Sequence, residues 1–307
     1  MRVLVAGATG AIGRPLVARL QEAGHEVSAI ARSQEKAARL RSRGVEPHVA
    51  DVFDRDAVVR ACVAARPEVV VHQLTALPKA LDPRRYAAAL EPTNRLRAET
   101  IPHFLEGARQ AGARKVIAQS VSFITAPVGP WVHNEDAPVD EQLSPAAAPT
   151  MAMERAVLGA HDLEGLVLRY GFFYGPGTYY APDGSTVGDV RRRRLPIIGK
   201  GTGISSFIHV EDAADATVLA LDRGAGVLNV TDDDPAPQHT WLPELAQILG
   251  AKAPRRAPAW LVRLVAGHYG VHFGTTLRGN SNARAKEQLG WAPARASWRQ
   301  GFREVLA

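Results

Sequence analysis

The chain has one cysteine, Cys62, among its 307 residues, so no disulfide within it can stabilise the fold. One cysteine and no closely spaced histidines give no pattern of a zinc site, and we expect no metal. No apolar run reaches the ~20 residues of a membrane span, and the best candidate, residues 257–271, is interrupted by Arg263 and His268. We therefore expect a cytoplasmic protein without a cleaved leader or a membrane partner.

Lysine is also scarce. Only six of the 37 basic residues are lysine, and none lies between Lys115 and Lys200. The net charge of +6 includes one dense cluster, four arginines at 191–194. We interpret this cluster as a solvated face, with contact to a phosphate or an anionic substrate as the alternative. No aromatic platform or DNA-reading motif accompanies it, so we expect no nucleic-acid partner.

What is present is the pattern of an α/β protein. Hydrophobic residues make up 46% of the chain and charged residues 22%, as in globular proteins. Strand-like apolar runs alternate with helical patterns, which predicts a doubly wound parallel sheet with helices on both faces. The expected strands are 3–6, 26–31, 46–50, 68–73, 115–119 and 165–169, and the expected helices are 12–23, 34–43, 54–65, 84–111 and 150–161.

The regular alternation ends near residue 170. Residues 171–186 are rich in Gly, Pro and Tyr and are predicted as loop, while strands resume at 205–210 and 226–230 around a helix at 211–222. The remainder is helical and interrupted by prolines. We predict a dinucleotide-binding domain of residues 1–170 and 205–231, and a smaller, discontinuous substrate-capping domain of residues 171–204 and 232–307.

A glycine motif stands where the first strand turns into the first helix. Gly7, Gly10 and Gly13 allow the tight turn and the close approach of backbone to a pyrophosphate. The helix that follows offers free N–H groups and the positive end of its dipole. The position between a strand and an amphipathic helix predicts dinucleotide binding.

The end of the second strand favours NADP(H) over NAD(H). Arg32 stands 19 residues after Gly13 and is followed by Ser33. NAD-binding proteins of this type have an acidic residue near the position of Arg32. A guanidinium cannot accept from a ribose hydroxyl but suits a 2′-phosphate. Arg14 is an alternative source of that contact. Asp51 after the third strand is expected either to accept from the adenine amino group or to cap a helix.

Seven motifs in this order resemble the extended short-chain dehydrogenase/reductase family, of the NAD(P)-dependent epimerase/dehydratase type. They are Gly7/Gly10/Gly13, residues 50–52, residues 71–76, Asn94, and residues 168–177, 206–216 and 283–293. The resemblance implies a Rossmann-like fold. It completes the expected cofactor site, which consists of Gly7, Thr9, Gly10, Ala11, Ile12, Gly13, Arg32, Ser33, Asp51, Val52, Leu74, Thr75, Ala76, Asn94, Tyr170, Gly171, Phe172 and Phe173.

The chain departs from this family in its catalytic pair. Family members typically use Tyr-x-x-x-Lys with a Ser or Thr to pass a proton as hydride moves. No tyrosine here has a lysine four positions later, and alignment places Ala146 at the tyrosine position and Thr150 at the lysine position. Either another residue donates the proton, or the substrate needs no donor, or the dinucleotide is bound without turnover.

Four residues are candidate replacements. Ser120 and Ser122 follow the fifth strand, and Tyr170 and Tyr174 follow the sixth, at the sheet edge where ligands gather. The alternatives are loop-end serines and packed aromatic side chains.

We favour an NADP(H)-dependent oxidoreductase that acts on a small carbonyl or hydroxyl compound with a non-standard proton donor. The alternatives are an NADP(H)-binding sensor or regulatory protein, and a non-redox epimerase, dehydratase or lyase. A homodimer through the helix expected at 84–111 is a further possibility; the sequence does not identify the substrate.

Overall fold

Strand β1 (Arg2–Ala6) is buried from both sides. Val3 and Val5 join one hydrophobic core, while Leu4 and Ala6 join the other. Side chains that alternate between two cores are the mark of a strand in the middle of a sheet covered on both faces. The computed structural model, which describes residues 1–307, is built around this two-sided sheet.

The sheet has seven strands in the order β12-β7-β5-β4-β1-β2-β3, and every neighbouring pair is parallel. The other six strands are β2 (Glu26–Ala31), β3 (Glu46–Val49), β4 (Val69–His72), β5 (Lys115–Val121), β7 (Glu164–Tyr170) and β12 (Gly226–Val230). The order reverses between β1 and β4, and doubly wound folds bind ligands at the carboxyl ends of strands there. The predicted doubly wound, Rossmann-like fold is confirmed.

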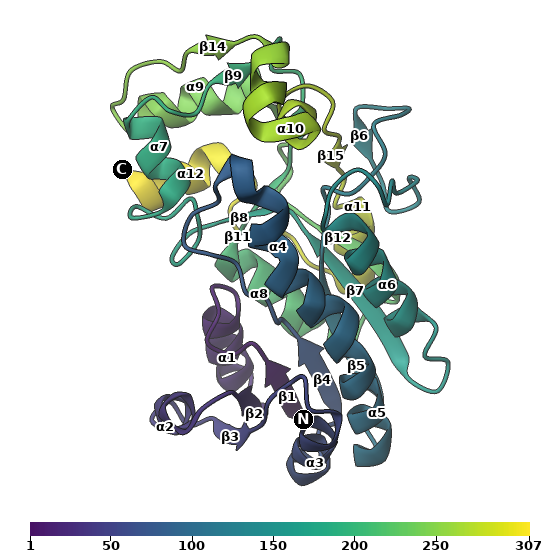
Figure 1. Cartoon of the computed structure of the whole chain (residues 1–307). Helices are drawn as coiled ribbons and strands as arrows, with labels where there is room; N and C mark the ends of the chain where they lie inside the picture. Colours follow the sequence, from purple (N-terminus) through teal and green to yellow (C-terminus); the bar gives the residue numbers. More distant parts are fainter.

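Helices cover both faces of the sheet (Figure 1). One face carries α1 (Gly13–Glu22), α2 (Gln34–Arg41), α8 (Val210–Leu219) and α11 (Ala283–Leu289), whose apolar residues share a core. The other face carries α3 (Arg55–Ala65), α5 (Ile101–Ala111) and α6 (Ala147–Leu158). Because α11 packs in this way, a segment from the end of the chain joins the core of the sheet half.

The single helix expected over residues 84–111 is wrong. The structure divides it into η1 (Pro83–Arg85), α4 (Tyr86–Arg95), a π-helical turn η2 (Leu96–Thr100) and α5. Pro102 lies in the first turn of α5 and has no N–H to continue a regular helix. Within the π turn, Thr100 Oγ1 donates to the carbonyl of Leu96 at 2.6 Å. Such π turns occur frequently at functional sites.

Two further boundaries differ from the prediction. Helix α6 begins at Ala147, three residues before the expected start at 150. Residues 171–186, expected as loop, contain the strand β8 (Phe172–Tyr174), which pairs in parallel with β11 (Phe207–His209). The apolar run at 172–174 is therefore stabilised by a partner more than thirty residues away, which local sequence does not reveal.

A smaller cap lies above the carboxyl edge of the sheet (Figure 1). Its core includes Phe207, Trp241, Trp298 and Phe302. It contains α7 (Ser185–Arg191), α9 (Gln238–Ile248), α10 (Ala259–Thr275), α12 (Trp298–Leu306) and the short strands β9 (Ile197–Ile198), β10 (Ile204–Ser205), β13 (Ala236–Pro237) and β14 (Arg256–Ala257). Beside it, β6 (Val132–His133) pairs with β15 (Gly279–Asn280).

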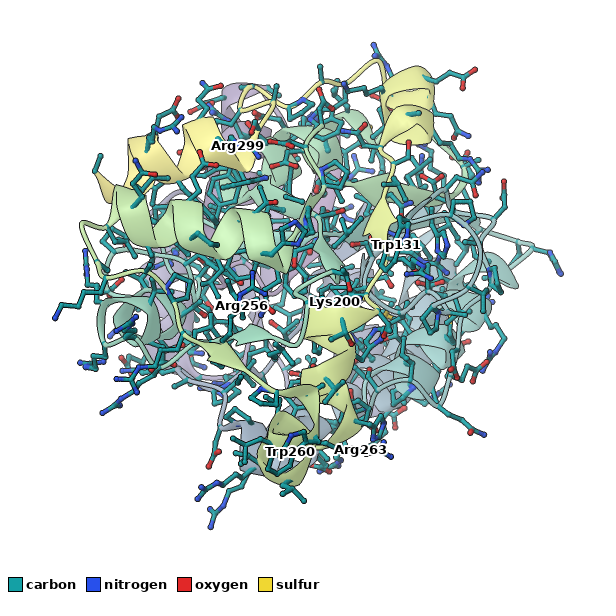
Figure 2. All side chains as sticks on the ribbon, turned by 90° about the horizontal axis from the view of Figure 1, so that it is seen from above. Trp131, Lys200, Arg256, Trp260, Arg263 and Arg299 are labelled. Atoms are coloured by element: carbon teal, nitrogen blue, oxygen red, sulfur yellow. The ribbon has the colours of Figure 1, made fainter.

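The outer surface of the cap carries basic and aromatic side chains. Seen from above, Trp260 and Arg263 lie together on α10, while Lys200 and Arg256 lie nearer the centre of this face (Figure 2). The arginines at 191–194 are all exposed at the end of α7. None of the helices combines the length and hydrophobicity needed to cross a bilayer.

Candidate active site

The glycine turn is packed so tightly that glycine is required at positions 7 and 13. Gly7 has a φ of 99°, and a Cβ added to it would lie 2.6 Å from the carbonyl oxygen of Gln73. A Cβ on Gly13 would lie 2.1 Å from the carbonyl oxygen of Gly7. The backbone N–H groups of Ala11 and Ile12 donate to no acceptor in the chain. Unpaired donors before a helix N-terminus fit the pyrophosphate of a dinucleotide.

The rim of this turn is open. Thr9 and Gly10 are exposed, and the exposed Arg14 follows in the first turn of α1. The Arg14 guanidinium lies against Gly177, where an added Cβ would be 2.3 Å from Nη2. Arg14 makes no ion pair, so its charge is available to the phosphates of a bound dinucleotide.

Arg32 borders a pocket of about 500 Å³ at the end of β2. Its other lining residues are Lys36, residues 75–78, Ala88, Ala89 and Pro92. Neither Arg32 nor Lys36 has a carboxylate partner. Burial, and then the nearby Arg32 guanidinium, lower the pKa of Lys36. Two unpaired cations in one pocket suit a phosphate.

Sequence analysis missed Lys36, although its position follows from the turn in which it lies. Ser33, expected to bind the cofactor, accepts from the Lys36 backbone N–H at 3.3 Å and caps α2. This cap holds Lys36 on the first turn of the helix, near Arg32. A lysine three residues after a capping serine, beside a predicted phosphate contact, was the available signal.

Asp51 does not cap α3. Its carboxylate accepts from the Phe53 N–H at 3.0 Å, while Asp54 accepts from Ala57 and caps the helix. The carboxylate of Asp51 is exposed, and the neighbouring Val52 is half-buried. The capping alternative for Asp51 is therefore wrong, because the chain makes three more residues of turn before α3 begins.

The segment after β4 is tied to the helix beside it. Ala76 N–H donates to Thr93 Oγ1 at 2.9 Å, and both Thr75 and Ala76 line the pocket of Arg32. Leu74 packs against the core on the α3 face. Asn94 Nδ2 donates to the carbonyl of Pro145 at 2.8 Å. Asn94 thus anchors the chain that leads into α6, the helix in which the catalytic pair was sought.

The two serines after β5 lie in different environments. Ser120 is fully buried, and its hydroxyl donates to Glu154. Glu154 also forms a buried, two-pronged ion pair with Arg169 at 2.9 and 2.6 Å. Ser122 is 1% exposed, and its hydroxyl makes no hydrogen bond within the chain. Of the two, Ser122 has the hydroxyl available to a ligand.

The tyrosines after β7 are packed away from solvent. Tyr170 is fully buried, and its hydroxyl is bonded to Thr217 at 2.6 Å and to Gln73 at 3.2 Å. Burial raises its pKa to about 12. Tyr174 is also fully buried, and its ring contacts Phe302 in the core of the cap. These placements favour packing over proton transfer for both residues.

The rest of that segment lines the boundary between sheet and cap. Gly171 passes so close to Ser206 that an added Cβ would lie 2.5 Å from its carbonyl oxygen. Phe173 contacts the ring of Tyr170, while Phe172 stacks on Phe123 with centroids 4.6 Å apart. Phe172 thereby faces the segment that carries Ser122.

The expected positions of the missing pair are occupied by small side chains. Ala146 is 3% exposed and immediately precedes α6, and Thr150 is fully buried one turn later. Thr150 Oγ1 accepts from Arg97 Nη1 at 3.1 Å. No amine or phenol stands at either position, so α6 contributes no standard proton donor to this site.

Comparisons with known proteins agree with this geometry. Residues 3–231 match the model of the NAD dependent epimerase/dehydratase family. The chain is 50% identical over 308 residues to 3-diazoavenalumate denitrifying reductase of a Streptomyces species, covering 98% of this chain and 99% of that protein. UDP-glucose 4-epimerase of Thermus thermophilus in complex with NAD is 25% identical, with a TM-score of 0.75 over 99% of this chain and 97% of the other.

A human epimerase family protein, in a crystal structure with NADPH, shares the fold with a TM-score of 0.75 at 20% identity over 99% of each chain. These two structural neighbours were thus solved with NAD and with NADPH, respectively.

Proposed function

Because the chain belongs to the NAD dependent epimerase/dehydratase family, we propose that it is an NADPH-dependent reductase that replaces the diazo group of a small organic acid by hydrogen. The observation that carries the proposal is the 50% identity, over nearly the whole of both chains, to a denitrifying reductase of a diazo compound. The absence of the catalytic tyrosine and lysine, whose expected positions hold Ala146 and Thr150, supports the same chemistry.

The chemistry accounts for the missing pair. Bound NADPH supplies a hydride, and replacement of a diazonium group by that hydride forms a C–H bond and releases N₂ without consuming a proton. A positioned proton donor is valuable only where the transition state needs a proton. Residues of this site therefore have to orient the substrate and exclude water, and these tasks leave no role for a tyrosine on α6.

The phosphate end supports NADPH as the reductant. Arg32 and Lys36 line one pocket without carboxylate partners, and Ala11 and Ile12 offer free N–H groups. A 2′-phosphate would satisfy both cations, whereas the ribose hydroxyl of NADH would leave their charges unpaired.

A second candidate is carbonyl reduction with Ser122 as the proton donor. The free, nearly buried hydroxyl of Ser122 at the end of β5 favours it. Carbonyl reduction requires a proton, whereas the diazo reaction does not. An experiment can therefore distinguish the two functions.

The test supplies the purified protein with 3-diazoavenalumate and NADPH carrying deuterium at the transferred position. We expect loss of NADPH absorbance, one N₂ released per NADPH consumed, and deuterium on the product carbon that carried the diazo group. NADH is expected to support the reaction less well. Turnover of ketones, but not of the diazo acid, would replace the proposal by the second candidate.

A further inference from the structure

Arg97 is a buried cation that no acid of the chain neutralises. It lies on the π turn η2, is 5% exposed, and makes no ion pair. The one carboxylate whose charge raises the pKa of Arg97, Glu154, is already paired with Arg169 and hydrogen-bonded to Ser120. Burial lowers the pKa of Arg97 to about 10, which still leaves it charged at neutral pH. A buried charge without a partner is strongly disfavoured unless a ligand completes the site.

One edge of the Arg97 guanidinium is free. Nη1 donates to Thr150, but Nε is buried without a partner and Nη2 donates to no group of the chain. Other arginines of this protein use the same edge to bind a carboxylate. Nε and Nη2 of Arg109 donate to the two oxygens of Asp162. Arg169 grips Glu154 in the same way. The free edge of Arg97 is therefore built to receive two lone pairs of an oxyanion.

Aromatic rings gather at the start of the helical stretch that carries Arg97. Tyr86 contacts Tyr269 and Phe273, with ring centroids 5.8 and 6.3 Å apart. Phe273 contacts Phe123 and Phe172 at 6.2 and 6.1 Å. We call these five residues the aromatic box. They come from α4, from the segment after β5, from β8 and from α10, so the box lies where the sheet edge meets the cap.

The aromatic box and Arg97 form one environment. Tyr86 begins α4, and Arg97 lies in η2, which continues that helix without a break. Burial raises the pKa of Tyr86 to about 12, and the charge of Arg97 acts against this rise. Ser122 immediately precedes Phe123 of the box. All five rings of the box are half-buried, so part of their surface is open to edge or stacked contact with a flat ring.

We propose that Arg97, with Thr150, binds an anionic oxygen of a planar aromatic substrate whose ring packs in the aromatic box. The inference rests on the proposed function, because the box must place that ring beside the cofactor that reduces it. In this arrangement the cation of the site comes from η2 instead of from the lysine position of α6. It acts in binding and positioning, and it transfers no proton.

The experiment titrates the full-length protein, saturated with NADP⁺ so that no turnover occurs, with four probes. Cinnamate carries a carboxylate, 4-nitrophenolate carries a phenolate, methyl cinnamate carries no charge, and octanoate is an anion without a ring. We expect saturable binding of at least one aromatic anion, with methyl cinnamate and octanoate at least about tenfold weaker. Which aromatic anion binds distinguishes a carboxylate from a phenolate at Arg97.

Three variants then test which residues bind the probes. Arg97→Gln is expected to weaken the aromatic anion at least about tenfold and to leave the affinities for methyl cinnamate and NADP⁺ unchanged. Arg109→Gln, which removes an exposed arginine, serves as the matched control and should change neither. Phe273→Leu should weaken the aromatic anion and methyl cinnamate alike. Circular dichroism and NADP⁺ titration establish that each variant is folded.

Three results would overturn the inference: methyl cinnamate or octanoate binding as tightly as the tighter of the two aromatic anions, no saturable binding of either aromatic anion, or an equal loss of NADP⁺ and anion affinity in Arg97→Gln. If Arg97→Gln does not fold, the affinities of the unaltered protein for the four probes still test the inference. Because none of these measurements involves hydride transfer, a failure to reduce diazo compounds would refute the proposed function separately.

Discussion

The two ends of the cofactor crevice are built on different principles. At the phosphate end the expected binding groups are mainly backbone N–H groups. A Cβ added to Gly13 would lie 2.1 Å from the carbonyl oxygen of Gly7, so no larger residue fits there. At the nicotinamide end the family's chemistry belongs to two side chains on one helix, and here Ala146 and Thr150 stand in their places. The fold around them is intact.

This difference explains why one end follows the family and the other departs from it. A backbone site is altered only by disturbing the turn that forms it. A pair of side chains on a helix is replaced without disturbing the helix, provided that the cavity is filled and buried polar atoms remain satisfied. Thr150 meets this condition by accepting from Arg97. In the proposed function, the phosphate end binds the cofactor and the nicotinamide end determines the reaction.

The largest effect is expected at the backbone site. Gly13→Ala places a methyl group 2.1 Å from the Gly7 carbonyl oxygen, so we expect NADPH affinity to fall at least about a thousandfold. Calorimetry measures this loss. Gly188→Ala is the control, since its Cβ meets only the mobile end of Arg192. Unchanged binding in Gly13→Ala would contradict the view that the turn is sterically determined.

The second effect tests the scaffold of the nicotinamide end. Glu154→Gln leaves Arg169 buried without its counter-charge, with side chains only 2% and 4% exposed. We expect the free energy of unfolding to fall by about 3–5 kcal/mol, measured by urea denaturation. In Glu35→Gln, which removes the exposed partner of Arg39, the change should stay within about 0.5 kcal/mol. Equal effects would mean that the buried pair has no special structural role.

The third-largest effect distinguishes the binding of NADPH from the binding of NADH. Arg32→Ala and Lys36→Ala each remove one cation from the same pocket, so each should weaken NADPH by about 10–100-fold and leave NADH unchanged. Arg39→Ala removes an exposed residue of α2 paired with Glu35 and is expected to change neither. If both cofactors weakened equally, the pocket would not be the site of a 2′-phosphate.

The smallest effect is expected at Ser122, the proton donor of the second candidate function. Ser122→Ala should change kcat for the diazo acid by less than about threefold, because that reaction requires no proton there. The same variant should lower carbonyl reduction by about 10²–10⁴-fold if Ser122 is its proton donor. A large loss with the diazo acid would show that a proton is transferred after all, and would remove the contrast between the two ends.

The sequence predicted the sheet well because its signals are local. Runs such as residues 69–71 consist of valine alone, and helical patterns separate such runs. The glycine turn was equally clear, since its residues are contiguous. The prediction failed at α4 and α5, where Pro102 and a π turn divide an otherwise helical stretch, and at β8, whose partner is distant.

The sequence by itself determined that this chain forms a doubly wound sheet with a dinucleotide turn, and that it lacks the usual catalytic pair, because contiguous residues encode all three. Only the tertiary structure decided which side chains replace that pair. Arg97 and Thr150 are 53 positions apart, and the aromatic box draws on four separate segments. Such sites depend on which buried groups lack partners, and that is settled only when distant segments pack together.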